Sequence, residues 1–143
     1  MTLQAFDASG LALLATIVLI FPMFYFAFAS LTFFLRPLAD PIVGRMLRGL
    51  FHASFLAMGG LGALAGLAFM ATRQHAVAAG LGLLAACTLA SRTLWLRRID
   101  AVLRAPGPGT PGQLRRLQWA GMAYNACQLL ILLPSLPRLF PIR

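Results

Sequence analysis

The chain has 143 residues, of which 60% are hydrophobic and 10% are charged, whereas soluble domains carry about 25% charged residues. Its formal net charge of +9 comes from 12 arginines and 3 aspartates, because lysine and glutamate are both absent. This composition excludes an ordinary soluble domain, and the position of the arginines beside apolar runs argues against a nucleic-acid-binding surface. We therefore expect a membrane protein whose partners include the lipid bilayer and its anionic headgroups, and no nucleic acid.

Four apolar runs are long enough to cross a bilayer, which takes about 20 residues. They lie at residues 11–35, 49–71, 76–96 and 117–136. The first run has no preceding cation and is too long for the apolar part of a signal peptide, so we expect it to remain as a span. The sequence thus predicts a single all-α domain over residues 1–143: an integral membrane four-helix bundle of antiparallel up-down hairpins.

The arginines are distributed unevenly among the connections between these runs. Eight lie after the first and third runs, and Arg92 lies near the end of the third, whereas Arg73, Arg138 and Arg143 lie elsewhere. Cytoplasmic connections carry the excess of arginine in membrane proteins. We therefore expect both termini outside, in the periplasm, and the protein in the inner membrane of a bacterium.

Capping residues predict where two of the helices begin. Asp40 followed by Pro41 is typical of a helix start, since a carboxylate caps free amides and proline fits the first helical position. Thr110 and Gln113 have the spacing of a capping box, so the last helix should begin near Pro111. Both helices would then begin before the apolar run that they contain.

The third helix should continue beyond its apolar run. Asp100 and Arg104 are four residues apart, which is the spacing of a favourable ion pair on a helix surface. The proline–glycine stretch at 105–109 must then end the helix.

Small residues on the second and third runs predict close helix packing, which in lipid depends on close backbone approach. The second run contains Gly62 and Gly66 as a GxxxG motif, with Gly59 three residues earlier. In the third run they recur at every fourth position: Ala78, Gly82, Ala86 and Ala90. We interpret these as the matched faces of a hairpin. The alternatives are a homo-oligomer contact, a docking surface for a larger membrane complex, and an exposed ligand groove.

Polar residues within the runs form the candidate site. On the fourth run the polar or small residues at i, i+3, i+7 and i+10 share one face: Gln118, Gly121, Asn125 and Gln128. His52 shares a face with the glycines of the second run, and Arg92 follows Thr88 by four residues. The predicted topology brings these side chains to a similar depth near the cytoplasmic side. The candidate binding residues are His52, Arg92, Gln118, Asn125 and Gln128.

Arg92 has three interpretations, because a charge inside a span is costly and often functional. Its long side chain could reach the headgroups, bond to the polar face of the fourth helix, or bind a ligand.

Catalysis is not expected. The chain has no glutamate, and none of its aspartates lies within a run, so no carboxylate pair, catalytic triad or clustered metal site can be assembled. A haem with two axial histidines would need His52 from two subunits, because His75 lies on the opposite side of the membrane from His52 in the predicted topology. Cys87 and Cys127 fall within apolar runs, where small buried hydrophobic residues are expected rather than disulfides. No cofactor or metal is predicted.

The segment Leu114-Arg115-Arg116-Leu117-Gln118, followed by Asn125, resembles the motif that opens the last helix in a bacterial family of uncharacterised four-helix membrane proteins related to eukaryotic transmembrane protein 205. The order of the basic connections and the Phe51-His52 pair fits the same layout. The family usually has histidine where this chain has Gln118 and serine where it has Gly121, so Asn125 is the position that carries over. The resemblance implies a four-helix membrane protein, and the family has no assigned activity.

The sequence therefore predicts a small, non-enzymatic inner-membrane protein whose polar cluster binds a small molecule or stabilises the bundle. The first alternative is an accessory subunit of a larger membrane complex, packed through the glycine face of the second helix. The second alternative is a haem or redox membrane protein.

Overall fold

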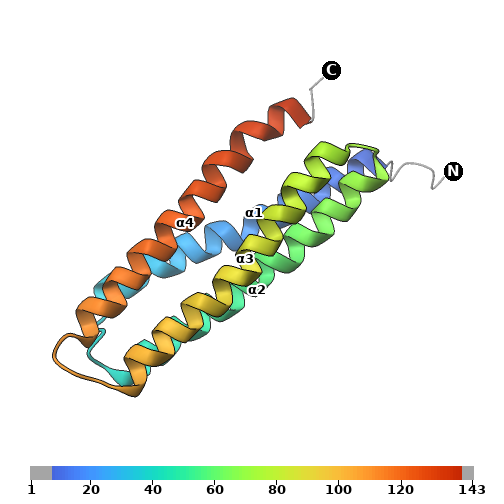
Figure 1. The fold of residues 1–143 in the computed structure, drawn as a ribbon. Helices are drawn as coiled ribbons and strands as arrows, with labels where there is room; N and C mark the ends of the chain where they lie inside the picture. Colours follow the sequence, from blue (N-terminus) through green and yellow to red (C-terminus); the bar gives the residue numbers. More distant parts are fainter. Residues whose placement is uncertain (1–7, 140–143) are drawn as a thin grey trace, which may run out of the picture.

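The computed structural model describes residues 8–139, which form four long helices and one short 3-10 helix (Figure 1). Their bounds are α1 Ala8–Thr32, η1 Phe33–Leu35, α2 Pro41–Ala71, α3 His75–Arg104 and α4 Thr110–Leu139. No strand occurs in this part of the chain. The predicted all-α fold with four helices is confirmed.

Three helical stretches among the described residues are long and apolar enough to cross a membrane: Gly10–Leu35, Pro41–Ala71 and His75–Arg104. These give the chain the character of a membrane protein. Helix α4 has 30 residues but does not reach the same hydropathy, because Gln118, Asn125 and Gln128 interrupt its apolar sequence.

The connections between the helices lie at two ends of the bundle. The connection from α1 to α2 and the connection from α3 to α4 lie together at the lower left of Figure 1, and the turn from α2 to α3 lies at the opposite end. We call the first the arginine-rich end, because residues 36–48 and 97–116 contain eight of the arginines.

The start of α2 follows the predicted capping chemistry. The Asp40 carboxylate accepts a hydrogen bond from the Ile42 amide at 2.8 Å, and Pro41 is the first helical residue. The predicted start of α4 near Pro111 is confirmed to within one residue, but the capping contact differs from the prediction. Its helix begins at Thr110, whose hydroxyl accepts from the Gly107 amide at 2.8 Å and so closes the preceding turn rather than pairing with Gln113.

The turn between α2 and α3 is built on a positive-φ residue that is not glycine. Arg73 has a φ of 60°, and its amide donates to the Met70 carbonyl at 3.0 Å, while the Gln74 amide donates to the Phe69 carbonyl at 3.1 Å. These two bonds form the Schellman motif that satisfies the last carbonyls of a helix. Glycine usually occupies the Arg73 position because it adopts this conformation without steric cost.

The glycines of α2 lie against α3. A Cβ atom placed on Gly62 would lie 3.3 Å from the Ala85 Cβ, and one placed on Gly66 would lie 3.3 Å from the Ala78 carbonyl oxygen. A Cβ on Gly59 would collide with the Leu89 side chain. The two helices therefore approach each other as closely as glycine permits.

The face that α3 presents differs from the predicted one. Gly82 and Ala86 are exposed, and the buried positions of this stretch are Ala78, Leu81, Ala85 and Thr88. A repeat of four residues drifts around a helix of 3.6 residues per turn, so a long row of fourth positions leaves the packing face. Only the first member of the predicted row, Ala78, remains buried.

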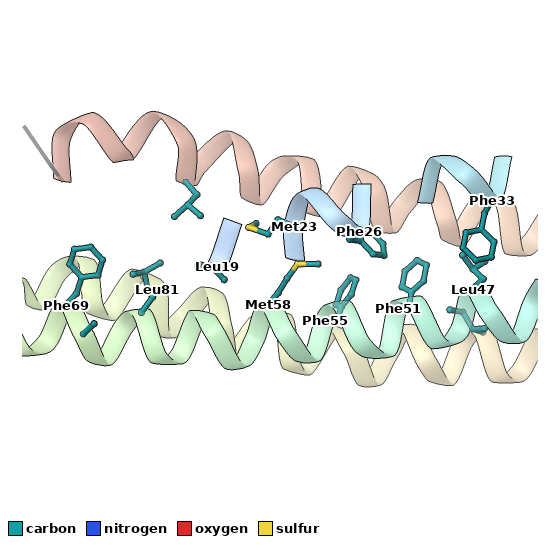
Figure 2. Packing of buried hydrophobic residues seen from close by; sticks show 14 of the residues in the cluster. Leu19, Met23, Phe26, Phe33, Leu47, Phe51, Phe55, Met58, Phe69 and Leu81 are labelled. Carbon is teal, nitrogen blue, oxygen red and sulfur yellow. The ribbon is translucent and has the colours of Figure 1, made fainter. Parts of the chain in front are cut away.

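The core between α1 and α2 is aromatic near the arginine-rich end, and Figure 2 shows its side chains pointing toward one another. The Phe26 ring contacts Phe51 edge-on at 5.1 Å and Phe55 at 5.7 Å. Helix α4 presents Gly121 here, where an added Cβ would lie 2.5 Å from the Phe51 ring. The missing side chain thus makes room for the aromatic cluster.

The outer surface of the bundle is apolar. Large side chains such as Phe21, at 77% exposure, and Leu130, at 72%, point outward. Cys87 and Cys127 are free and exposed on the same kind of surface, so the prediction that they are buried is wrong. Both cysteines lie in apolar helices, but on the faces of those helices that point away from the core.

Candidate functional site

The end of α1 is held by two side chains of α4. Gln118, fully buried, donates from Nε2 to the Ser30 carbonyl at 2.6 Å, and Arg115 donates to the Phe33 carbonyl at 3.0 Å. Residues Phe33–Leu35 form a 3-10 turn. The last carbonyls of α1 therefore lack their usual α-helical partners and can accept from other groups. Arg115 also donates to Gln118 Oε1 at 3.1 Å, so both ends of this buried amide are satisfied.

Deeper in the bundle, Asn125 links α4 to α1 with one end of its amide. Its Nδ2 atom donates to the Met23 carbonyl at 2.9 Å. Its Oδ1 atom is buried and has no hydrogen-bond partner among the described residues. Asn125 is 1% exposed, so water in the surroundings does not readily reach this oxygen.

A second set of polar contacts links α4 to α3. Gln128 donates from Nε2 to the Thr88 hydroxyl at 2.8 Å, and Thr88 donates to the Leu84 carbonyl at 2.8 Å. The Tyr124 hydroxyl lies 3.4 Å from the same Thr88 oxygen. Gln128 Oε1 is buried without a partner among the described residues.

His52 and Arg92 link α2 to α3. The Nη2 atom of Arg92 lies 2.9 Å from Nδ1 of His52. Because a guanidinium can only donate, the imidazole nitrogen in this contact is the acceptor and carries no proton. Both side chains are half-buried, and the buried Nε atom of Arg92 has no partner among the described residues.

No carboxylate neutralises Arg92 in the described structure. The aspartates in this part of the chain are Asp40, which caps α2, and Asp100, which pairs with Arg48. The polar partner of the Arg92 guanidinium among the described residues is therefore the His52 ring and not a carboxylate. A cation in a low-dielectric setting without a counter-charge favours an anionic or strongly accepting partner.

A hollow of about 210 Å³ lies between α3 and α4. Tyr124, Trp95 and Arg98 line it, with Ser91 and Leu94. Ser91 precedes Arg92 in the chain, and Tyr124 contacts Thr88. The hollow is thus linked to Gln128 through Tyr124 and Thr88, whereas none of the five predicted binding residues lines it.

The structure divides the predicted site residues into two groups. Gln118 and Asn125 bond to backbone carbonyls of α1, and Gln128 bonds to α3, so the buried face predicted on α4 serves two neighbours. His52 and Arg92 bond to each other across α2 and α3. Of the three interpretations of Arg92, the structure shows a hydrogen bond, but to α2 rather than to the polar face of α4.

Two contributors were not predicted as site residues. Arg115 belongs to the arginines that predict the orientation of the chain, and its position three residues before Gln118 places both on one helix face. Tyr124 lies in an apolar part of the sequence. Its position four residues before Gln128 places both on one helix face, and this spacing is the signal that could have identified it.

The described residues do not form a cluster of metal ligands. No group of three or more histidine, cysteine or acidic side chains comes together within residues 8–139.

Comparison of the chain with protein-family models, with curated proteins and with solved structures finds no match.

Proposed function

We propose that the chain is a non-enzymatic multi-pass protein of the bacterial inner membrane that binds a small polar molecule at the cluster of His52, Arg92, Gln118, Asn125 and Gln128. In this proposal all four helices cross the membrane as antiparallel hairpins, with both termini in the periplasm. The position of eight arginines at one end of the bundle supports a cytoplasmic assignment of that end. The resemblance to the family related to transmembrane protein 205 fits the same layout.

The observation that carries the proposal is that three of the five buried, unpartnered side-chain polar atoms among the described residues belong to this cluster: Arg92 Nε, Asn125 Oδ1 and Gln128 Oε1. The other two are the hydroxyl oxygens of Ser30 and Ser54. Leaving a buried donor or acceptor unsatisfied costs about 1–3 kcal/mol. A bundle that served only for packing could place apolar residues here at lower cost. A bound molecule that accepts from Arg92 and donates to an amide oxygen would recover these hydrogen bonds.

The ligand should be small and should carry an acceptor or a negative charge. Its size is limited because Asn125 is 1% exposed and Gln128 is 4% exposed, which leaves little free space around their amide oxygens. The uncompensated guanidinium of Arg92 selects its charge, because hydrogen bonds to ionised groups are roughly twice as strong as neutral ones.

The test is to purify the full chain in detergent from its native membranes and identify small molecules released on denaturation by mass spectrometry. The matched pair is Arg92→Gln and Arg97→Gln, since Arg97 is an exposed arginine on the same helix. We expect a stoichiometric small molecule with the wild-type chain and with Arg97→Gln, and its loss with Arg92→Gln, while thermal unfolding shows both variants folded. A folded wild-type protein without any such molecule, or equal recovery from both variants, would contradict the proposal.

The contacts of the structure favour this function over its alternatives. A docking role for the glycine face of α2 must compete with α3, which already covers Gly59, Gly62 and Gly66. A haem ligand role for His52 must compete with Arg92, whose Nη2 atom lies 2.9 Å from one imidazole nitrogen and 3.4 Å from the other.

A further inference from the structure

A separate hollow of about 460 Å³ lies at the arginine-rich end, between the first turns of α2 and the last turns of α3. Three arginines and one aspartate line it together with two uncharged residues: Arg45, Arg48, Arg104, Asp100, Gly49 and Leu103. None of these residues belongs to the polar cluster described above.

The charges of this hollow do not balance. Arg48 donates from Nε and Nη2 to the two carboxylate oxygens of Asp100, the second bond measuring 3.1 Å. Arg104 donates only to the Asp100 backbone carbonyl, at 3.3 Å, and Arg45 forms no ion pair within the described part of the chain. Three guanidinium groups thus face one carboxylate, which leaves an excess of two positive charges.

The geometry of the hollow suits an anion with several oxygens. The two-point contact with Asp100 fixes the plane of the Arg48 guanidinium and leaves its Nη1 atom outside that pair. Guanidinium groups in such fixed positions bind phosphate oxygens through paired hydrogen bonds. A Cβ atom on Gly49 would meet nothing within 4 Å, so this position leaves the hollow open.

We propose that this hollow binds a phosphate group, either in the headgroup of an anionic phospholipid or in a soluble phosphate-bearing molecule. Gly49 is the first residue of the predicted span 49–71, and the other five residues lie just outside the predicted spans 49–71 and 76–96, where we expect lipid headgroups. The polar cluster plays no part in this proposal, so either one can fail without the other.

The experiment measures the thermal unfolding of the full chain in a neutral detergent. The probes are phosphatidylglycerol, phosphatidylcholine at the same mole fraction, and millimolar inorganic phosphate. A ligand that binds the folded state raises the unfolding temperature according to its concentration relative to its Kd. We expect phosphatidylglycerol to stabilise the protein more than phosphatidylcholine, because phosphatidylcholine carries a compensating positive charge.

Two variants locate the effect and a third controls for net charge. Arg45→Gln with Arg104→Gln should weaken binding about tenfold or more, since each charge-assisted hydrogen bond contributes strongly. Gly49→Leu keeps every charge and should weaken binding by filling the hollow. The control is Arg97→Gln with Arg116→Gln, which removes the same charge from exposed positions outside the hollow.

The outcomes separate the sources of the phosphate. Stabilisation by phosphatidylglycerol that is lost in both hollow variants and kept in the control supports a lipid headgroup site. Stabilisation by inorganic phosphate with the same variant pattern supports a soluble phosphate-bearing molecule. Equal responses to phosphatidylglycerol and phosphatidylcholine with no response to phosphate, or equal losses in hollow and control variants, overturn the proposal. Unfolding without added probe checks that each variant is folded.

Discussion

The α2–α3 pair and the attachment of α4 show two different ways of joining helices in one small bundle. Helices α2 and α3 meet through glycines whose missing side chains bring the backbones together. Helix α4 is instead linked to α1 and α3 through buried amides that bond to backbone carbonyls and to a hydroxyl. The first joint depends on shape and the second on hydrogen bonds, so substitutions should affect them differently.

The largest effect is expected from Gly62→Leu. A Cβ on Gly62 would already lie 3.3 Å from Ala85, so a leucine must push α2 and α3 apart and should destabilise the fold by about 3 kcal/mol. The measurement is unfolding of the detergent-solubilised protein. Gly60→Leu is the control, because a Cβ there meets nothing within 4 Å and leucine favours helix more than glycine. Equal destabilisation by both would show that the α2–α3 joint does not depend on close packing.

A smaller effect is expected from Gln118→Leu at the α4 joint. The substitution leaves the Ser30 carbonyl and one Arg115 donor without their bonds to Gln118, and should cost about 2 kcal/mol. Unfolding of the variant should be compared with that of Gln113→Leu, an exposed glutamine on the same helix. A cost no larger than that of the control would mean that hydrogen bonding does not hold α4.

In the turn between α2 and α3, one substitution is expected to stabilise the fold rather than destabilise it. Arg73→Gly should stabilise the fold by about 1 kcal/mol, since the residue has a φ of 60° that glycine adopts without strain. The same unfolding measurement checks it. Arg73→Ala is the control and should lack the gain, because alanine retains the Cβ that causes the strain.

The smallest effect is expected from Asn125→Leu. The bond to the Met23 carbonyl is lost, but the unpartnered Oδ1 atom is removed as well, so the net cost should be about 0.6 kcal/mol, similar to other hydrogen bonds between membrane helices. Comparison with Gln118→Leu in one unfolding series tests this difference. This small cost refers to protein freed of bound small molecules, because the proposed ligand would give Oδ1 a partner and raise the cost. A cost as large as that of Gln118→Leu in the freed protein would contradict the prediction.

Spacing along the sequence predicted which residues share a helix face, but not which neighbour that face meets. The spacing of Gln118, Asn125 and Gln128 correctly predicted one buried stripe, because 3.6 residues per turn is a local property. Their division between α1 and α3 depends on the rotation and position of α4 in the bundle, which no local pattern records. The helix start at Asp40 was predictable for the same local reason.

Partners on the backbone were the least predictable part of the site. Gln118 and Asn125 bond to carbonyls of Ser30 and Met23, and every residue has such a carbonyl, so the sequence contains no signal for these contacts. Asp100 shows a related difficulty. Its neighbour Arg104 at four residues suggested a local ion pair, whereas its carboxylate binds Arg48 on α2.

The hydrogen bonds from α4 to the end of α1 have a consequence for the order in which the helices can pack during synthesis. Helices α2 and α3 are adjacent in the chain, so their joint can form once residue 104 has left the ribosome. The carbonyls near the end of α1 that bond to Arg115 and Gln118 must wait for the last helix, made some 80 residues later in the chain. Truncation before α4 would therefore leave these two carbonyls near the end of α1 without their hydrogen-bond donors, although the α2–α3 pair would be complete.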